Sequence, residues 1–423
     1  MKILSLVFIL SSVAAQTAKA LPAFAIREKA SCVMCHTNGS APHLTPLGYL
    51  YRRAGFRFPD NIGNKDNDAK AMTFQEHMAA GVSISYELVS AKAPGSTNAT
   101  ITSNQINVPE VELWPLVGSF LGNFAVWSEL DATPGTAGGA ANVELSQADL
   151  RYAAGTANSF FNFRGGIMAP EGFGASDQWL DDGNIPLMDQ LAPQYNQDTL
   201  VTPFGAMNKP ELGVEFGYNY YSSHLTLGFY NGFSAYDSSN PPNLGLTPAL
   251  MNKTSGISKD YKLQLDQFVG DIGAITLSYY KGYIKLADPV NNAYLWGNDY
   301  NTERAYLTYF AVPNTLDILL GGALSTNQYN LGNSPTADGT FQSSGAFAGL
   351  NYYVAPHLTL AGRADYNKYS KLKDHAIGYS LQASMPFENN QFIFRFNQTG
   401  SDLASAVPQG STSDFRAEWR FLF

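Results

Sequence analysis

One short motif in the sequence carries clear cofactor chemistry, Cys32-Val33-Met34-Cys35-His36. Its two cysteines are the only ones in the 423-residue chain. In a C-x-x-C-H motif both thiols can reach the vinyl groups of one haem, and the adjacent imidazole becomes the proximal ligand of the iron. The motif therefore predicts a single covalent haem c held by Cys32, Cys35 and His36. The same residue types also suit a redox dithiol, or a zinc site completed by His43.

The sixth ligand of the haem iron is open in the sequence. Low-spin electron-transfer haems take Met or His at this position. The candidates before or at the first expected strand are His43, Met72, His77 and Met78, and an open site is the remaining alternative. With His36, His43 is thus a candidate metal ligand. Arg52 and Arg53 are candidate partners for the haem propionates, because a guanidinium donates two hydrogen bonds to a carboxylate, although a charged helix surface explains them equally well.

The first twenty residues have the pattern of a secretory signal peptide. Lys2 precedes an apolar run over 3–13 that is too short to span a bilayer, and Ala18-Lys19-Ala20 has the small-x-small pattern of a cleavage site. Export suits a haem c, because the thiols are attached to haem outside the bacterial cytoplasm. No later stretch has about 20 uninterrupted apolar residues, so no transmembrane helix is expected.

The composition favours a membrane β-barrel over a water-soluble enzyme. Aromatic residues make up 13% of the chain and charged residues only 14%, whereas soluble domains carry about a quarter charged residues. Apolar residues recur mainly with a period of two, which predicts strands. The formal net charge of −9 argues against a nucleic acid as partner.

The final segment, residues 415–423, alternates most clearly. Phe, Ala and Trp occupy one side, whereas Arg416, Glu418 and Arg420 occupy the other. An apolar face against lipid and a charged face against water is the pattern of a transmembrane β-strand. A terminal Phe423 also resembles the C-terminal signal of outer-membrane barrels. The same alternation recurs over 211–220, 358–366 and 391–397.

Segments of this kind predict an all-β transmembrane barrel of about sixteen antiparallel strands over residues 81–423. Short turns alternate with long polar loops, as expected for periplasmic turns and outside loops. An even number of strands places the N- and C-termini together on the periplasmic side. A barrel of this size leaves a lumen. Residues 21–75, after the signal peptide 1–20, are predicted to form a monohaem cytochrome c segment of helix and loop in or under that lumen.

The residues around the haem motif resemble a known family. The motif is preceded by Pro22, Phe24 and Ala25. It is followed by the pattern L-x-x-(F/L)-G-x-x-(F/Y)-(K/R)-x-x-G-(F/Y), formed by Leu44, Leu47, Gly48, Tyr51, Arg52, Gly55 and Phe56. This arrangement is similar to the fused cytochrome–porins of the bacterial outer membrane, whose best-known members are iron oxidases. Many iron-oxidising members of this family carry a second His three residues after the haem-motif His, where this chain has Gly39.

The resemblance implies an outer-membrane electron conduit with one covalent haem c. It would move electrons between an extracellular donor, with ferrous iron favoured, and periplasmic cytochromes, and so act as a possible iron(II) oxidase rather than a conventional enzyme. The partners implied are outer-membrane lipid, periplasmic electron carriers and extracellular iron. The alternative is a solute-selective porin whose haem segment is an accessory plug or sensor.

Two further features are weaker signals. Loop 169–209 holds Asp177, Asp181, Asp182 and Asp189 beside Trp179 and could attract a divalent cation, although a solvated acidic loop is the simpler explanation. Tyr294, Trp296 and Tyr300 are predicted to belong to interfacial aromatic girdles rather than to an electron path.

Overall fold

The computed structural model describes most of the chain from Pro22 to Leu422. The described residues are 22–37, 43–63, 77–92, 100–108, 111–120, 122–133, 142–168, 211–231, 255–287, 294–330, 339–355, 357–369, 374–387, 390–401 and 410–422. The predicted signal peptide, loop 169–209, Met72 and Phe423 lie outside them.

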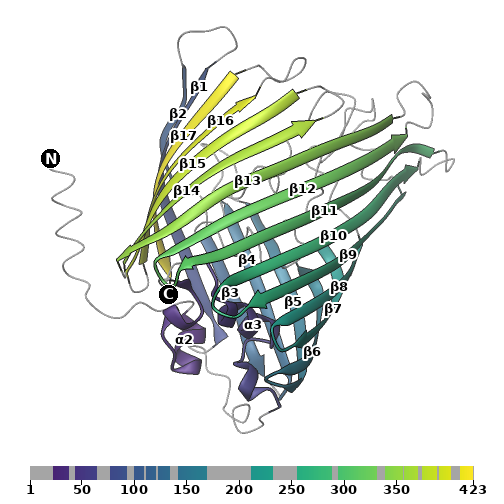
Figure 1. Ribbon diagram of the computed structural model, residues 1–423, viewed down its shortest axis with the longest axis vertical. Coiled ribbons are helices and arrows are strands. Elements are labelled where there is room, and N and C mark those ends of the chain that lie inside the picture. The colour runs from purple at the N-terminus through teal and green to yellow at the C-terminus, as the bar shows by residue number, and fades with distance from the viewer. Residues whose placement is uncertain are drawn as a thin grey trace.

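The described strands form one closed antiparallel barrel (Figure 1). Consecutive strands pair along the chain, except that β2 and β3 both pair with β1, and β17 pairs with β1 to close the ring. The strands are β1 (Ala79–Lys92), β2 (Thr100–Asn107), β3 (Val111–Phe120), β4 (Phe124–Thr133), β5 (Asn142–Thr156), β6 (Ser159–Met168), β7 (Glu211–Tyr220), β8 (Ser223–Tyr230), β9 (Ser255–Val269), β10 (Gly273–Ala287), β11 (Tyr294–Val312), β12 (Leu316–Asn330), β13 (Gly339–Ala355), β14 (Leu358–Tyr369), β15 (Asp374–Phe387), β16 (Asn390–Ser401) and β17 (Gly410–Leu422).

The barrel has sixteen strand positions although the sheet contains 17 strands, because β2 and β3 share one position. β2 pairs with the second half of β1, from Ser85 to Ala91, and β3 pairs with its first four residues, Ala79 to Val82. Both run antiparallel to β1, so they are two parts of one interrupted strand. The predicted barrel of about sixteen strands is confirmed, with one extra short strand.

Side chains alternate between the lumen and the outer surface as the sequence pattern predicts. On β7, Glu215 and Asn219 are each 1% exposed, whereas Phe216 and Tyr218 between them are 39% and 49% exposed. On β14, Arg363 and Asp365 are buried and Leu360 and Tyr366 are exposed. This arrangement, with polar residues inside and apolar residues outside, is the reverse of that in a soluble protein. It matches a barrel surrounded by lipid.

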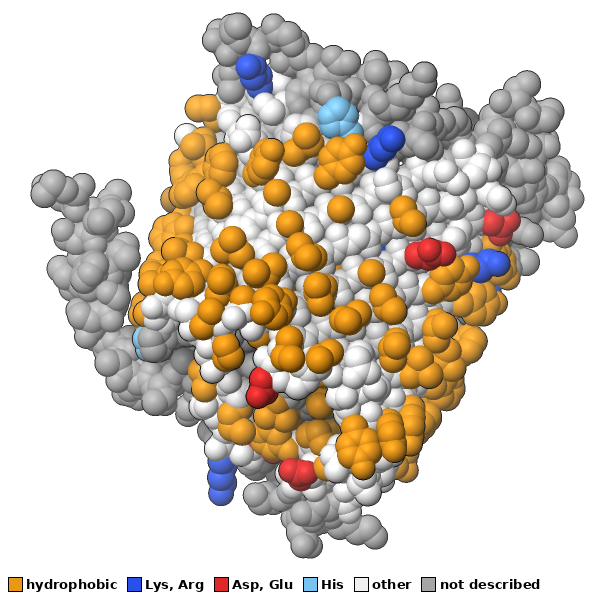
Figure 2. Space-filling model, viewed as in Figure 1, with side chains coloured by type: hydrophobic (Ala, Val, Ile, Leu, Met, Phe, Trp, Pro, Cys, Tyr) orange, Lys and Arg blue, Asp and Glu red, His pale blue; other side chains and the backbone are white. Residues whose placement is uncertain are grey.

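The outer surface carries few charges. Figure 2 shows apolar side chains spread over the face formed by the later strands, with acidic and basic side chains sparse and scattered. Among the described residues, no helix is long and apolar enough to cross a membrane.

The outer face provides a test of membrane insertion. Leu381 lies near the middle of β15 and is 62% exposed. Leu381→Arg is expected to destabilise the barrel by about 2–4 kcal/mol in a bilayer, because a charge would then face the hydrocarbon. Urea-dependent folding into lipid vesicles measures the change. Leu212→Arg, also on an outward position but at the end of β7, is the matched control and should cost about 0–1 kcal/mol.

Short connections gather at one end of the barrel. Those of two or three residues include 157–158, 221–222, 270–272, 313–315 and 388–389, and the connections at the other end include 169–210 and 231–254. β1 begins and β17 finishes at the end with the short turns. In Figure 1 the helices that precede the barrel lie at this same end.

In the described part of the chain before the barrel, the short elements are α2 (Pro22–Glu28), η1 (Cys32–Met34), α3 (Pro46–Arg53) and η3 (Pro59–Asn61). Thr45 begins α3 as its N-cap, accepting a hydrogen bond from the Gly48 backbone N–H, and Pro46 follows at the first helical position. The helix ends before Gly55, whose φ of +72° turns the chain away from the helix axis. We call residues 22–63 the lumenal segment, since their contacts lie on inward-facing wall residues.

Candidate functional site

The C-x-x-C-H motif forms one tight turn within the lumenal segment. The His36 backbone N–H donates to the Cys32 carbonyl over 2.8 Å, which brings the first cysteine and the histidine onto one turn. His36 then pairs with Leu44 in an isolated antiparallel bridge, and the Thr45 N–H donates to the Cys35 carbonyl over 2.9 Å. The turn is therefore fixed by backbone hydrogen bonds on both sides of the motif.

α3 packs directly against this turn. A Cβ atom at Gly48 would lie 2.1 Å from the Cys35 carbonyl oxygen, so only glycine permits the approach. The Thr45 hydroxyl also donates to the Met34 carbonyl over 2.9 Å. Tyr51 and Phe56 form a buried cluster that Cys35 joins. The residues that carried the family resemblance are thus the ones that support the motif.

The two cysteines and the histidine of the motif are buried or half-buried. Cys32 and Cys35 form no disulfide, and burial, with the charge of Glu28 adding to it, raises the pKa of the Cys35 thiol to about 11. Burial and the nearby Arg52 charge lower the pKa of His36 to about 4, so the imidazole is neutral. Its Nδ1 atom is enclosed and has no hydrogen-bond partner within the described part of the chain.

The lumenal segment is attached to the barrel wall by a buried ionic cluster around Glu215 of β7. Its carboxylate accepts from Arg53 of α3 over 3.3 Å, from Arg164 of β6 over 3.1 Å and from Lys262 of β9 over 2.7 Å. The Tyr230 hydroxyl donates to the same carboxylate. All five residues are buried, and one of them, Arg53, comes from the lumenal segment.

A second attachment involves His43 on the opposite part of the ring. The His43 side chain is fully buried, with its Nδ1 atom 3.0 Å from the Tyr353 hydroxyl of β13. Tyr353 donates to Asp317 of β12 over 2.6 Å, and His43 Nε2 lies 4.0 Å from the same carboxylate. The structure therefore places His43 against the wall. Its predicted role as a metal ligand stays a prediction.

Further contacts distribute the attachment around the ring. The Tyr49 hydroxyl donates to Asp266 of β9, and the Arg57 guanidinium donates to the Phe124 carbonyl of β4. The Arg27 guanidinium donates to the Ser119 carbonyl of β3. With Glu215 and the Tyr353–Asp317 pair, these contacts reach strands on widely separated parts of the ring. The lumenal segment is a plug that the wall holds from several sides.

The other candidate residues occupy different surroundings. Arg52 lies close enough to His36 to shift its pKa, whereas Arg53 is engaged with Glu215, so the two neighbouring arginines have separate partners. His77 is buried beside Gly118 of β3, and Met78 immediately precedes β1. No sequence signal had marked Glu215, Asp317 or the other wall partners beyond their lumen-facing position.

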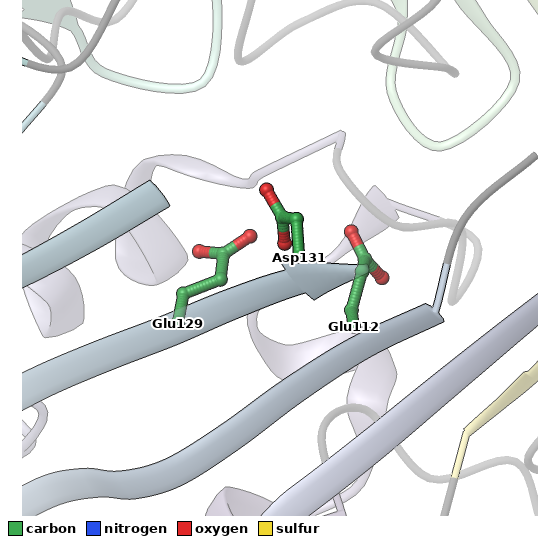
Figure 3. Close-up of side chains that lie close together, drawn as sticks. All are labelled: Glu112, Glu129 and Asp131. Atoms are coloured by element: carbon green, nitrogen blue, oxygen red, sulfur yellow. The ribbon is translucent and has the colours of Figure 1, made fainter. Parts of the chain in front are cut away.

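The zinc alternative stays a prediction. Within the described ranges, the grouping of three potential metal ligands is a different one, formed by Glu112 of β3 with Glu129 and Asp131 of β4. Figure 3 shows these three carboxylates side by side on neighbouring strands. Their ligand atoms lie within 4.8 Å of one another. In the part of the chain that the structure describes, Cys32 and Cys35 belong to no such grouping.

Tyr300 corrects one prediction about the aromatic residues. It is 3% exposed, and its hydroxyl donates to the buried Asp260 of β9. Tyr300 therefore faces the lumen and does not belong to an outer aromatic girdle. Alternate residues of a strand lie on one face, and Tyr300 shares its face of β11 with the buried Thr302 and Arg304.

Comparisons with known proteins address the barrel. The outer-membrane channel DcaP of Acinetobacter baumannii is similar with a TM-score of 0.51 and 8% identity, covering 82% of this chain and 96% of DcaP. An anion-selective porin from Comamonas acidovorans is similar with a TM-score of 0.50 and 9% identity, covering 82% of this chain and 98% of that porin. The fold is that of an outer-membrane porin. No family model matches the sequence, and no curated protein matches it.

Proposed function

We propose that the protein is an outer-membrane electron conduit with one covalent haem c, of the cytochrome–porin kind. The observation that carries this proposal is the position of the C-x-x-C-H turn, which is held within a plug inside a porin-type barrel. Electrons do not cross about 30 Å of hydrocarbon unaided at useful rates. A redox centre fixed in a protein-lined lumen shortens that distance from both sides.

The residues of the turn fit this cofactor. Cys32 and Cys35 would each form a thioether bond, and they form no disulfide with each other. The neutral His36 would bind the iron, and a neutral ring nitrogen is what a metal requires. Arg52, beside His36, is the residue we assign to a propionate. When bound, haem c supplies a centre that accepts and releases one electron.

The chain's own residues would hold this centre in place and exclude water from it. Arg53, Tyr49 and His43 attach the plug to three parts of the wall, and Gly48 lets α3 close over the turn. The end with the short turns would face the periplasm, as would both termini, and periplasmic cytochromes would exchange electrons there. The favoured extracellular donor is ferrous iron, which would enter from the other end.

Retention of haem tests the cofactor. The expressed protein should keep its haem after denaturation and stain for peroxidase activity on a gel, because thioether bonds survive unfolding. Cys32→Ser and Cys35→Ser should each weaken this retention, and the double variant should abolish it. A colourless wild-type protein containing stoichiometric zinc would contradict the assignment.

Electron transfer across a membrane tests the function. In liposomes that enclose an electron acceptor, external ferrous iron should reduce the acceptor through the wild-type protein. His36→Ala should reduce this rate at least tenfold, because the proximal ligand is lost, while leakage of small solutes stays low. His357→Ala, at an exposed short turn, is the matched control and should leave the rate unchanged.

A second candidate is a solute-selective porin with an accessory haem plug. The likeness of the barrel to an outer-membrane channel and to a porin described as anion-selective favours it. This function predicts high solute flux that does not change in His36→Ala. Low flux in the same liposomes would instead favour the conduit.

A further inference from the structure

Trp127 of β4 lies at the boundary between the plug and the remaining lumen. Its ring stacks on Phe56 of the plug, with ring centroids 5.4 Å apart and an interplanar angle of 29°. Its indole N–H points the other way along the strand and donates to Glu129 over 2.9 Å. The apolar body of the indole therefore contacts the plug while its polar edge contacts the lumen wall.

On the plug side, Trp127 continues into a packed aromatic cluster that reaches the haem motif. Phe24 stacks on Phe56 with centroids 4.9 Å apart, and Tyr51 meets Phe24 edge-on at 5.8 Å. Cys35 packs against this same cluster, which also includes the buried Ala125 of the wall. A continuous set of side-chain contacts thus runs from Trp127 to one of the two cysteines.

On the lumen side, the wall beyond Trp127 is polar. Glu129 and Asp131 follow on the same face of β4, and Glu112 faces them from β3 (Figure 3). Since a strand rises about 3.3 Å per residue, Asp131 lies about 13 Å farther from the short-turn end than Trp127. Trp127 is therefore the aromatic residue of β4 that meets both the plug and this polar stretch.

We propose that Trp127 is the positioning residue through which an electron passes from a donor in the lumen to the haem motif. This inference rests on the proposed function and names its entry route. Electron tunnelling weakens steeply across unfilled gaps, and the indole fills the space between the polar lumen and the Phe24–Phe56–Tyr51 cluster. In each transfer one ferrous ion in the lumen would become ferric, and the single electron that it loses would be taken up by the ferric haem that Cys32, Cys35 and His36 would hold.

The sidedness of reduction tests the route. Ferrous iron added at the long-loop side should reduce the haem at least tenfold more slowly in Trp127→Leu than in wild type. Trp127→Phe, which keeps an aromatic ring in contact with Phe56, should restore most of the rate. Reduction from the short-turn side by a reduced periplasmic cytochrome should stay unchanged, as should solute leakage. Trp419→Leu, on β17 away from the plug, is the matched control.

A merely structural role would give a different result. If Trp127→Leu only loosened the plug, reduction from both sides would change together and leakage would rise, and this would overturn the inference. An unchanged long-loop-side rate in a haem-loaded Trp127→Leu protein would also overturn it, while leaving the proposed function intact. A colourless protein would overturn both.

Fluorescence provides a readout independent of electron transfer. Haem quenches the emission of a nearby indole. In the haem-loaded protein, Trp127→Phe should therefore remove little fluorescence, because the emission of Trp127 is already quenched. In the haem-free Cys32→Ser/Cys35→Ser variant, the same substitution should remove the unquenched emission of one tryptophan. Equal losses from both proteins would place Trp127 far from the haem and contradict the route.

Discussion

Glu215→Leu is expected to release the plug from the wall. The substitution removes the carboxylate shared by Arg53, Arg164 and Lys262 and leaves three cations buried close together. Removing one partner of a buried ion pair costs about 3–5 kcal/mol. Moving Arg53 out of the cluster is the one relaxation that needs no change in the barrel itself. The lumenal segment should therefore become sensitive to protease at a lower urea concentration than the one that unfolds the barrel. Unfolding of the barrel is measured separately, from the migration of unheated protein on a gel.

Two further variants make this result specific. The double variant Glu215→Leu/Arg53→Met should lose less stability than the sum of the losses in the two single variants, because both changes act on one cluster. Asp365→Leu is the matched control, since its ion pair with Arg363 stays within β14 of the wall. It should weaken the barrel without exposing the plug selectively. Equal protease sensitivity of the plug in both variants would refute the role of Glu215 as an attachment point.

Gly48→Ala is expected to separate α3 from the C-x-x-C-H turn. In a helix interior Ala normally stabilises by about 1 kcal/mol relative to Gly, so propensity alone predicts a more stable protein. Here the new Cβ would lie 2.1 Å from the Cys35 carbonyl oxygen and 2.9 Å from the Cys35 Cα, both backbone atoms that cannot rotate away. Overpacking of this kind costs about 1–3 kcal/mol. The sign of the change therefore reports the contact.

The measurement is the fraction of protein that retains covalent haem, together with protease protection of residues 22–63. Both should fall in Gly48→Ala. Gly400→Ala on β16, where a Cβ would meet nothing within 4 Å, is the control and should change neither. A gain in protection at Gly48→Ala would show that helix propensity outweighs the contact.

The barrel was predictable from the sequence because one rule governs each strand. Lipid outside and water inside force alternate residues such as Glu215 and Phe216 onto opposite faces, and this alternation is local information. Closure into a ring was also predictable. An even number of strand positions leaves the last strand, β17, antiparallel to β1 and able to pair with it. The interruption between β2 and β3 was not predictable, because it depends on two segments sharing one partner strand.

The site was predictable only in part. The C-x-x-C-H motif and the Gly48 pattern are contiguous, so spacing alone reveals them. The wall partners are not contiguous. Asp317 reads as one more polar lumen residue until the fold brings it beside His43, and Tyr300 reads as an interfacial aromatic until its side of the strand is known. Position around the ring is long-range information that a single sequence does not carry.

The attachment of the plug from several sides makes it an intramolecular ligand of its own barrel. Because the plug and β1 belong to one chain, a released segment would stay near the barrel and rebind rapidly. Docking is then an equilibrium, and each 1.4 kcal/mol lost from the wall contacts raises the undocked population tenfold. Brief current bursts in single-channel recordings would count these undocking events. Their frequency in Arg53, Tyr49 and His43 variants would rank the attachments on one energy scale.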